Sequence, residues 1–210
     1  MLYYIGRAMC RVILRTLGWR ETIGSKRMPK EGGVILAPNH VSYLDPPLVG
    51  SGISRQVHFM AKQELFDIPV FGFLIRAVGA FPVKRGTADR GALKKALELL
   101  NEGRVVCIFP EGARSQDNNL QPPELGFAMI ALKSRVPVVP TALVGTERSL
   151  SPKSPFFRFG RIKIMYGNPM TFEDLYDKSG RESLEEVGRR VMEAIGQLRA
   201  ELQTNQSASD

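Results

Sequence analysis

His40 is the residue whose type and surroundings most directly suggest chemistry. It stands in the segment APNHVSYLDP, directly after the apolar run VILA, and Asp45 follows it in the same segment. A turn between the two residues would let the Asp45 carboxylate accept a hydrogen bond from Nδ1–H, so that Nε2 acts as a general base near neutral pH. An ordinary loop histidine shows this spacing at least as often, so the pair alone leaves both interpretations open. His58 lies inside a strand-like run and is interpreted as structural.

Basic side chains follow two other apolar runs and are candidates for binding an anionic substrate. Lys84 and Arg85 come after AFPV, and Arg114 stands in FPEGARS, directly after VVCIF. Ammonium and guanidinium groups bind phosphate through charge-assisted hydrogen bonds, and Gly112 permits a tight turn or a close approach of the backbone to a ligand. Each cluster alone is typical of a solvated turn, but three polar clusters behind three apolar runs point to one shared site.

The sequence contains no recognisable protein nucleophile that such a base would activate. It has no G-x-S-x-G elbow, P-loop, G-x-G-x-x-G or H-E-x-x-H motif. Its two cysteines are too few for a disulfide framework or a multi-thiolate metal site, and they fit a reducing compartment. We therefore expect the nucleophile to be a hydroxyl group of the bound substrate, and we predict no metal ligands.

The elements that must position these residues are strands alternating with helices. The apolar runs typical of buried strands are VILA (34–37), VHFMA (57–61), AFPV (80–83), VVCIF (105–109), VPVVPTAL (136–143) and RIKIMY (161–166). Helical spacing over 93–100 ends at Gly103, and a Ser183–Glu186 capping box begins a last helix. The alternation predicts an α/β fold with a largely parallel central sheet flanked by helices. In such sheets, chemistry gathers at the carboxyl ends of the strands.

Residues 2–19 have the pattern of an amphipathic helix with a basic stripe. Arg7, Arg11 and Arg15 fall on one side, and apolar side chains occupy the opposite side. Three arginines argue against a membrane-spanning helix, and they interrupt any signal peptide. We expect the segment either to lie in a membrane interface with its arginines meeting lipid phosphates, or to cover the sheet as an ordinary amphipathic helix.

Length and composition are those of one globular domain, with 210 residues, 43% of them hydrophobic and 24% charged. We expect an amphipathic membrane-associating helix over 1–20, a globular domain over 21–203 and a disordered tail over 204–210. The net charge of +8 is uneven, because residues 1–30 hold seven basic residues and one acidic residue, whereas 171–210 hold five and nine. This asymmetry favours an anionic membrane or a nucleic acid as partner, and no nucleic-acid-binding motif is recognisable.

The stretch 66–81, FDIPVFGFLIRAVGAF, is the most hydrophobic part of the sequence. Pro69 and Gly72 interrupt it and Arg76 adds a charge, so we do not expect it to span a bilayer. A buried helix is the commoner outcome for such a stretch. The alternative is an exposed apolar surface beside the N-terminal helix, which would favour membrane contact.

Four blocks of the sequence, taken in order, resemble the motifs of glycerolipid acyltransferases. NHVSYLD (39–45) resembles the N-H-x-x-x-x-D signature, GAFPVKR (79–85) a block that ends in a basic residue, FPEGARS (109–115) the F-P-E-G-T-R-S block, and VPVVPTAL (136–143) a proline-containing fourth block. Order and spacing agree across residues 34–143. Within this family the sequence is most similar to the 1-acyl-sn-glycerol-3-phosphate acyltransferase group.

The resemblance implies transfer of a fatty acyl group from acyl-CoA or acyl carrier protein to the sn-2 hydroxyl of 1-acyl-sn-glycerol 3-phosphate (lysophosphatidic acid). The product is phosphatidic acid for phospholipid biosynthesis. By the same resemblance His40 is the general base and Asp45 orients it. The substrate-binding residues that it implies are Arg114, Arg85, Lys84, Glu111, Gly112 and Asn39. Among these, the two arginines bind the acceptor phosphate, Glu111 shapes that site, and Asn39 supports the loop.

The resemblance also implies the setting in which the protein acts. It requires no metal or cofactor, and the expected partners are lysophosphatidic acid, the thioester donor and an anionic membrane surface at the cytoplasmic face. Ala113 replaces the family's threonine, which keeps the turn, and we expect little effect from it. Glu124 stands where a lysine is common, and this carboxylate favours weaker phosphate binding or a different head group. The alternatives are a related enzyme with another acceptor (glycerol 3-phosphate, an amino lipid or another lysophospholipid) and a non-catalytic lipid-binding protein at the membrane surface.

Overall fold

The computed structural model describes residues 2–84, 89–149, 160–178 and 180–207. Its α-helices are α1 (Leu2–Thr16), α2 (Asp45–Gly52), α3 (Pro69–Ala77), α4 (Arg90–Asn101), α5 (Leu125–Ser134), α6 (Thr146–Ser149) and α7 (Arg181–Ser207). Its 3-10 helices are η1 (Ser25–Arg27) and η2 (Gln63–Phe66). Its strands are β1 (Trp19–Ile23), β2 (Val34–Pro38), β3 (Val57–Lys62), β4 (Phe81–Val83), β5 (Val105–Cys107), β6 (Val138–Val144) and β7 (Ile162–Tyr166).

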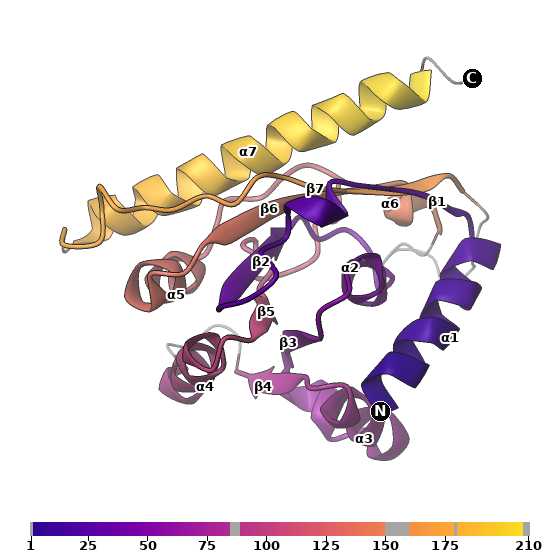
Figure 1. Ribbon diagram of the computed structural model, residues 1–210, viewed down its shortest axis with the longest axis horizontal. Coiled ribbons are helices and arrows are strands. Elements are labelled where there is room, and N and C mark those ends of the chain that lie inside the picture. Colours follow the sequence, from indigo (N-terminus) through magenta and orange to yellow (C-terminus); the bar gives the residue numbers. More distant parts are fainter. Residues whose placement is uncertain (1, 85–88, 150–159, 179, 208–210) are drawn as a thin grey trace.

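The described strands form one seven-stranded sheet in the order β1-β7-β6-β2-β5-β3-β4 (Figure 1). The strands from β6 to β4 in this order run parallel, whereas β7 and β1 run in the opposite direction. β2, β5 and β6 are buried along their whole length. Their continuous apolar runs suit strands that helices cover on both faces. The predicted α/β fold with a largely parallel central sheet is therefore confirmed.

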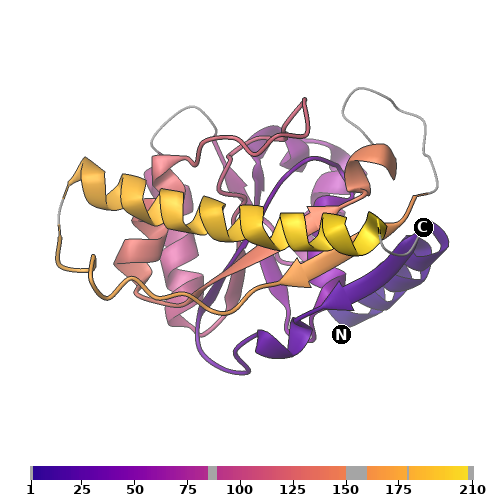
Figure 2. The same ribbon diagram turned by 90° about the horizontal axis from the view of Figure 1, so that it is seen from above.

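Helices cover both faces of this sheet. Ile35 and Ala37 of β2 belong to the core formed with α4, α5 and α7, whereas Val34 and Leu36 belong to the core formed with α1 and α2. In Figure 1 α4 and α5 lie to the left of the strands, α7 runs across the top, and α1 and α2 lie to the right. Figure 2 looks down on α7 where it crosses β6 and β7. The alternation of side chains along β2 thus divides the core between two helical layers.

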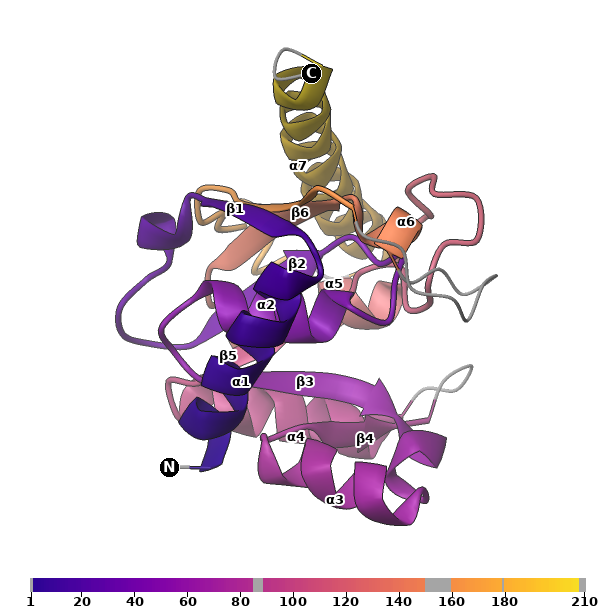
Figure 3. The same ribbon diagram turned by 90° about the vertical axis from the view of Figure 1, so that its right-hand side faces the viewer.

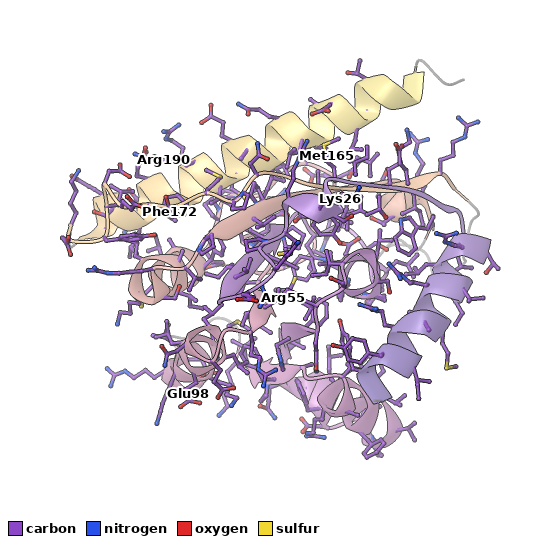
Figure 4. The ribbon with its side chains drawn as sticks, viewed as in Figure 1. Lys26, Arg55, Glu98, Met165, Phe172 and Arg190 are labelled. Atoms are coloured by element: carbon purple, nitrogen blue, oxygen red, sulfur yellow. The ribbon has the colours of Figure 1, made fainter. Side chains whose placement is uncertain are left out.

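Arg55 links the amino-terminal ends of three parallel strands through hydrogen bonds (Figure 4). Its guanidinium donates to the backbone carbonyls of Pro29, Gly32 and Gly103 at 2.8, 2.6 and 2.6 Å. The accepting loops lead into β2 and β5, and Arg55 itself lies just before β3. One side chain therefore joins the starts of three neighbouring strands, at the edge of the sheet opposite their carboxyl ends.

α1 packs against the protein through its arginines, so the expectation that these residues meet lipid phosphates is wrong for Arg7 and Arg11. Arg7 donates to the carbonyls of Ile53 and Ser54 at 2.8 and 2.6 Å, and Arg11 donates to the carbonyl of Ser51 at 2.8 Å. These carbonyls lie at the C-terminal end of α2, where orphan acceptors and the helix dipole favour cations. The large apolar side chains that α1 exposes are Tyr4, Ile5, Met9, Val12 and Ile13.

Residues 69–77 of the hydrophobic stretch over 66–81 form α3, and the expectation of a buried helix is wrong. The large apolar side chains that this stretch exposes are Ile68, Val70, Phe71, Phe73 and Leu74. Figures 1 and 3 both place the N-terminal end of α1 beside α3. Within the described part of the chain, no helix combines the length and the hydropathy needed to cross a membrane.

The ends of several elements differ from the sequence-based expectation. The segment WRETI, which was not predicted as a strand, forms β1 and pairs in parallel with β7. α7 begins at Arg181 and continues through Ser207, beyond the predicted end at residue 203. The Glu186 carboxylate accepts from Arg189 and Arg190, so it does not close the predicted capping box. The expected stop of α4 is confirmed, because its C-cap is Glu102 and the next residue is Gly103 with a φ of 74°.

Candidate functional site

His40 and Asp45 form a buried hydrogen-bonded pair at the carboxyl end of β2. β2 ends at Pro38 and α2 begins at Asp45, so the intervening turn folds the carboxylate back onto the imidazole. Nδ1 of His40 lies 2.8 Å from Oδ2 of Asp45. The same oxygen accepts the backbone N–H groups of Val41 and Ser42, both at 2.7 Å. The exposed fraction is 4% for His40 and 0% for Asp45, so water does not compete for these bonds.

This arrangement fixes the tautomer of His40. The Asp45 carboxylate can only accept, so the proton of the imidazole resides on Nδ1 and the lone pair on Nε2. The ring of Phe109 stacks on the imidazole at a centroid distance of 3.9 Å and an interplanar angle of 23°, which restricts rotation of the ring. Asp45 thus sets the protonation and Phe109 supports the orientation, as a general base requires.

Glu111 joins the FPEGARS loop to His40 through the backbone. Its Oε1 accepts from the backbone N–H of His40 at 2.7 Å, and its Oε2 accepts from the N–H of Gln121 at 2.9 Å. The N–H of Ser115 donates in turn to the carbonyl of His40 at 2.8 Å. Burial raises the pKa of Glu111, and the two N–H donors oppose that shift. Both backbone groups of His40 are therefore held by the loop that carries Arg114.

Asn39 holds the loop that carries His40 on the other side of β2, through hydrogen bonds to β6. Its side-chain amide donates to the carbonyl of Leu143 at 3.2 Å and accepts from the N–H of Leu143 at 2.7 Å. Asn39 is fully buried, and its backbone N–H donates to the carbonyl of Thr141. This pairing extends the β2–β6 ladder beyond its last strand residues and fixes the start of the loop that carries His40.

Arg114 and Gly112 lie on the turn that follows β5. The Arg114 guanidinium carbon sits 3.8 Å from the ring centroid of Tyr43, and among the described residues this side chain has no hydrogen bond or ion pair. Gly112 has a φ of 67°, and a Cβ there would approach Cγ of Glu124 to 2.7 Å, so the position demands glycine. The turn therefore presents a guanidinium with unused donors next to the buried His40–Asp45 pair.

Lys84 is not brought to the same place. Lys84 follows the end of β4, and its backbone N–H donates to Asp89 at 2.8 Å. In the sheet β4 is separated from β2 by β5 and β3, which at about 4.8 Å per strand corresponds to about 14 Å. Lys84 thus occupies the carboxyl edge of the sheet but lies away from the imidazole, and Arg85 lies outside the described residues.

The sequence reasoning missed Tyr43 and Phe109, which both contact site residues. Both stand within the matched motif blocks, so their position in those blocks was the available signal. Cys107, at the end of β5, is not a competing nucleophile, because burial and the nearby Asp45 charge raise the pKa of its thiol well above the ordinary value. Within the described part of the chain, no group of three or more His, Cys, Asp or Glu side chains could hold a metal ion.

Comparison with protein families gives a match over the part of the chain that holds this geometry. The family model described as Acyltransferase matches residues 20–144. This range contains the His40–Asp45 pair, the FPEGARS loop and Asn39 with its partner Leu143.

Individual relatives extend the match beyond that range. The chain is 30% identical to a 1-acyl-sn-glycerol-3-phosphate acyltransferase of Bacillus subtilis, over 91% of this chain and 94% of that protein. It is also 30% identical to a protein of the same description from Streptococcus pneumoniae, over 80% of this chain and 61% of that protein. The crystal structure of the 1-acyl-sn-glycerophosphate acyltransferase of Thermotoga maritima superposes with a TM-score of 0.74 and 27% identity, covering 94% of this chain and 78% of that one.

Proposed function

Because the chain belongs to the acyltransferase family, we propose that it transfers a fatty acyl group to the sn-2 hydroxyl of 1-acyl-sn-glycerol 3-phosphate and so produces phosphatidic acid. The acyl donor in this proposal is a thioester, either acyl-CoA or acyl carrier protein. The descriptions of the Bacillus, Streptococcus and Thermotoga relatives support this acceptor. The observation that carries the chemistry is the buried contact between Nδ1 of His40 and the Asp45 carboxylate.

The proposed reaction begins with proton transfer to His40. Nε2 takes the proton of the sn-2 hydroxyl, and the oxygen attacks the thioester carbonyl. The resulting tetrahedral intermediate collapses, the C–S bond breaks, and the thiolate leaves with the proton from the imidazolium. Asp45 stabilises the imidazolium between these two steps, since its Oδ2 is already bonded to Nδ1. Protons and electrons balance within these groups, so the proposal includes no metal or cofactor.

Arg114 is the residue that we assign to the acceptor phosphate. Its guanidinium is partly buried, has no acidic partner among the described residues, and stands on the loop that holds both backbone groups of His40. An uncompensated guanidinium in such a place favours a bidentate contact with a dianionic phosphate. Lys84 remains a candidate for the same substrate at greater distance, and Arg85, which lies outside the described residues, remains one by the resemblance of its motif block. The conformation of Gly112 lets the backbone of the loop approach the substrate.

The exposed apolar side chains of α1 and α3 are the surface that we assign to membrane contact. They lie on two neighbouring helices (Figure 3). Single exposed apolar residues are common on protein surfaces, whereas several of them on adjacent helices indicate an interaction site. The basic residues within 1–30 other than Arg7 and Arg11 add attraction for anionic lipids. We therefore place the protein as a peripheral protein on the cytoplasmic leaflet, where its lysophospholipid acceptor resides.

The proposed function is tested by assaying the purified full-length protein against a matrix of substrates. The acceptors are 1-acyl-sn-glycerol 3-phosphate, glycerol 3-phosphate and a lysophospholipid without a terminal phosphate monoester, each with acyl-CoA and acyl carrier protein donors. We expect turnover with the first acceptor and little with the third, since Arg114 recognises a phosphate monoester. Highest turnover with another acceptor would reassign the substrate, and binding without any turnover would favour the non-catalytic lipid-binding alternative.

A further inference from the structure

Tyr43 is an exposed aromatic residue within the turn that connects His40 to Asp45. Its exposed fraction is 53%, and its phenolic hydroxyl has no hydrogen-bond partner among the described residues. Its ring instead lies under the guanidinium of Arg114, at 3.8 Å from the guanidinium carbon to the ring centroid. Neither the core nor the pairing of the sheet requires an aromatic side chain at this position.

The acidic groups of the Arg114 loop have other partners. Glu111 accepts the N–H groups of His40 and Gln121, and Asp117 accepts from Ser115 Oγ at 2.8 Å and from the Asn119 amide at 2.9 Å. Glu111 and Asp117 therefore have hydrogen-bond partners other than Arg114. Among the described residues, the ring of Tyr43 is the contact that the structure shows for the Arg114 guanidinium.

A stacked guanidinium directs its donors outward in its own plane. The ring covers one face, while the N–H groups on the edge stay available for an in-plane, bidentate contact with phosphate. We propose that Tyr43 is a positioning residue for the acceptor, because its ring holds Arg114 in the orientation that binds the phosphate. Tyr43 lies between His40 and Asp45 in the sequence, so it also couples the position of the bound phosphate to the position of the hydroxyl that His40 deprotonates. This inference rests on the proposed role of Arg114.

Steady-state kinetics of Tyr43→Ala and Tyr43→Phe test the proposal, with each substrate varied in turn. An exposed cation–π contact corresponds to an increase of the acceptor KM by about two- to fivefold in Tyr43→Ala. The thioester KM and kcat should stay unchanged, and Tyr43→Phe should behave like the wild type because the ring remains. Tyr176→Ala is the matched control, since the Arg135 guanidinium carbon lies 5.4 Å from the centroid of its ring, and it should change neither KM.

A double-mutant cycle with Arg114→Ala separates this role from direct contact between Tyr43 and the lipid. If Tyr43 acts through Arg114, Tyr43→Ala adds no further increase of the acceptor KM in the Arg114→Ala background. The proposal is overturned if the increase persists there, if Tyr43→Phe is as impaired as Tyr43→Ala, or if Tyr43→Ala alone leaves the acceptor KM unchanged. An unchanged acceptor KM in Arg114→Ala alone would overturn the phosphate assignment of Arg114 as well.

Discussion

The double substitution Arg7→Gln, Arg11→Gln tests whether the basic stripe of α1 stabilises the fold or contacts lipid. In the structure these side chains donate three hydrogen bonds to carbonyls at the end of α2, at 2.8, 2.6 and 2.8 Å. Hydrogen bonds from a charged donor contribute about 1.5–3 kcal/mol each, and partial exposure lowers the total, so we expect a loss of about 2–4 kcal/mol. For a domain of this size that loss lowers the Tm by about 4–16 °C.

The assay uses the single tryptophan as its reporter. Trp19 is buried in the core cluster that also contains Leu14 of α1, so its fluorescence follows the loosening of this helix. Arg15→Gln is the matched control, because Arg15 is exposed and its side chain has no partner among the described residues. We expect the double variant to lose stability and the control to keep it. If both variants are as stable as the wild type and both bind anionic vesicles less well, the arginines contact lipid and our interpretation of α1 is wrong.

Three further predictions concern the site and the exposed apolar surface. Asp45→Asn should lower kcat by about a thousandfold or more, because an amide no longer stabilises the imidazolium. The Tm should change little, because the amide oxygen still accepts the backbone N–H groups. An unchanged kcat would contradict the role of the carboxylate. Glu124→Gln should lower the acceptor KM by about three- to tenfold, because it removes a negative charge that packs against Gly112; a higher KM would contradict it. Phe73→Glu should weaken sedimentation with anionic vesicles while kcat on detergent-dispersed substrate is retained; unchanged sedimentation would remove α3 from the membrane-contact surface.

The sequence is sufficient to predict the central strands and the pair at the end of β2. Continuous apolar runs such as VILA and VVCIF leave few alternatives to buried parallel strands. Because parallel strands end at the same edge, the residues that follow β2 and β5 meet there. His40, Glu111 and Arg114 were therefore predictable as neighbours, and the structure adds the atoms through which they are joined.

Other features depend on contacts between segments that are distant in the sequence. Helical periodicity places Arg7 and Arg11 on one stripe, but the direction of that stripe depends on the carbonyls that end α2. β1 is a short edge strand whose sequence WRETI carries charges, so it becomes a strand only by pairing with β7. Tyr43 stands at a variable position of the N-H-x-x-x-x-D motif, and its role becomes visible only with Arg114 above its ring.

The most direct test of the central claim compares acyl transfer by His40→Gln and His58→Gln, the two histidines of the chain. Both variants are assayed at saturating acceptor and donor, with circular dichroism and vesicle binding as controls for folding. If Nε2 of His40 is the base, kcat falls by about 10²- to 10⁴-fold in His40→Gln, whereas His58→Gln, which changes a side chain bonded to the carbonyl of Gly79, retains its turnover. Undiminished kcat in a folded His40→Gln protein would contradict the mechanism.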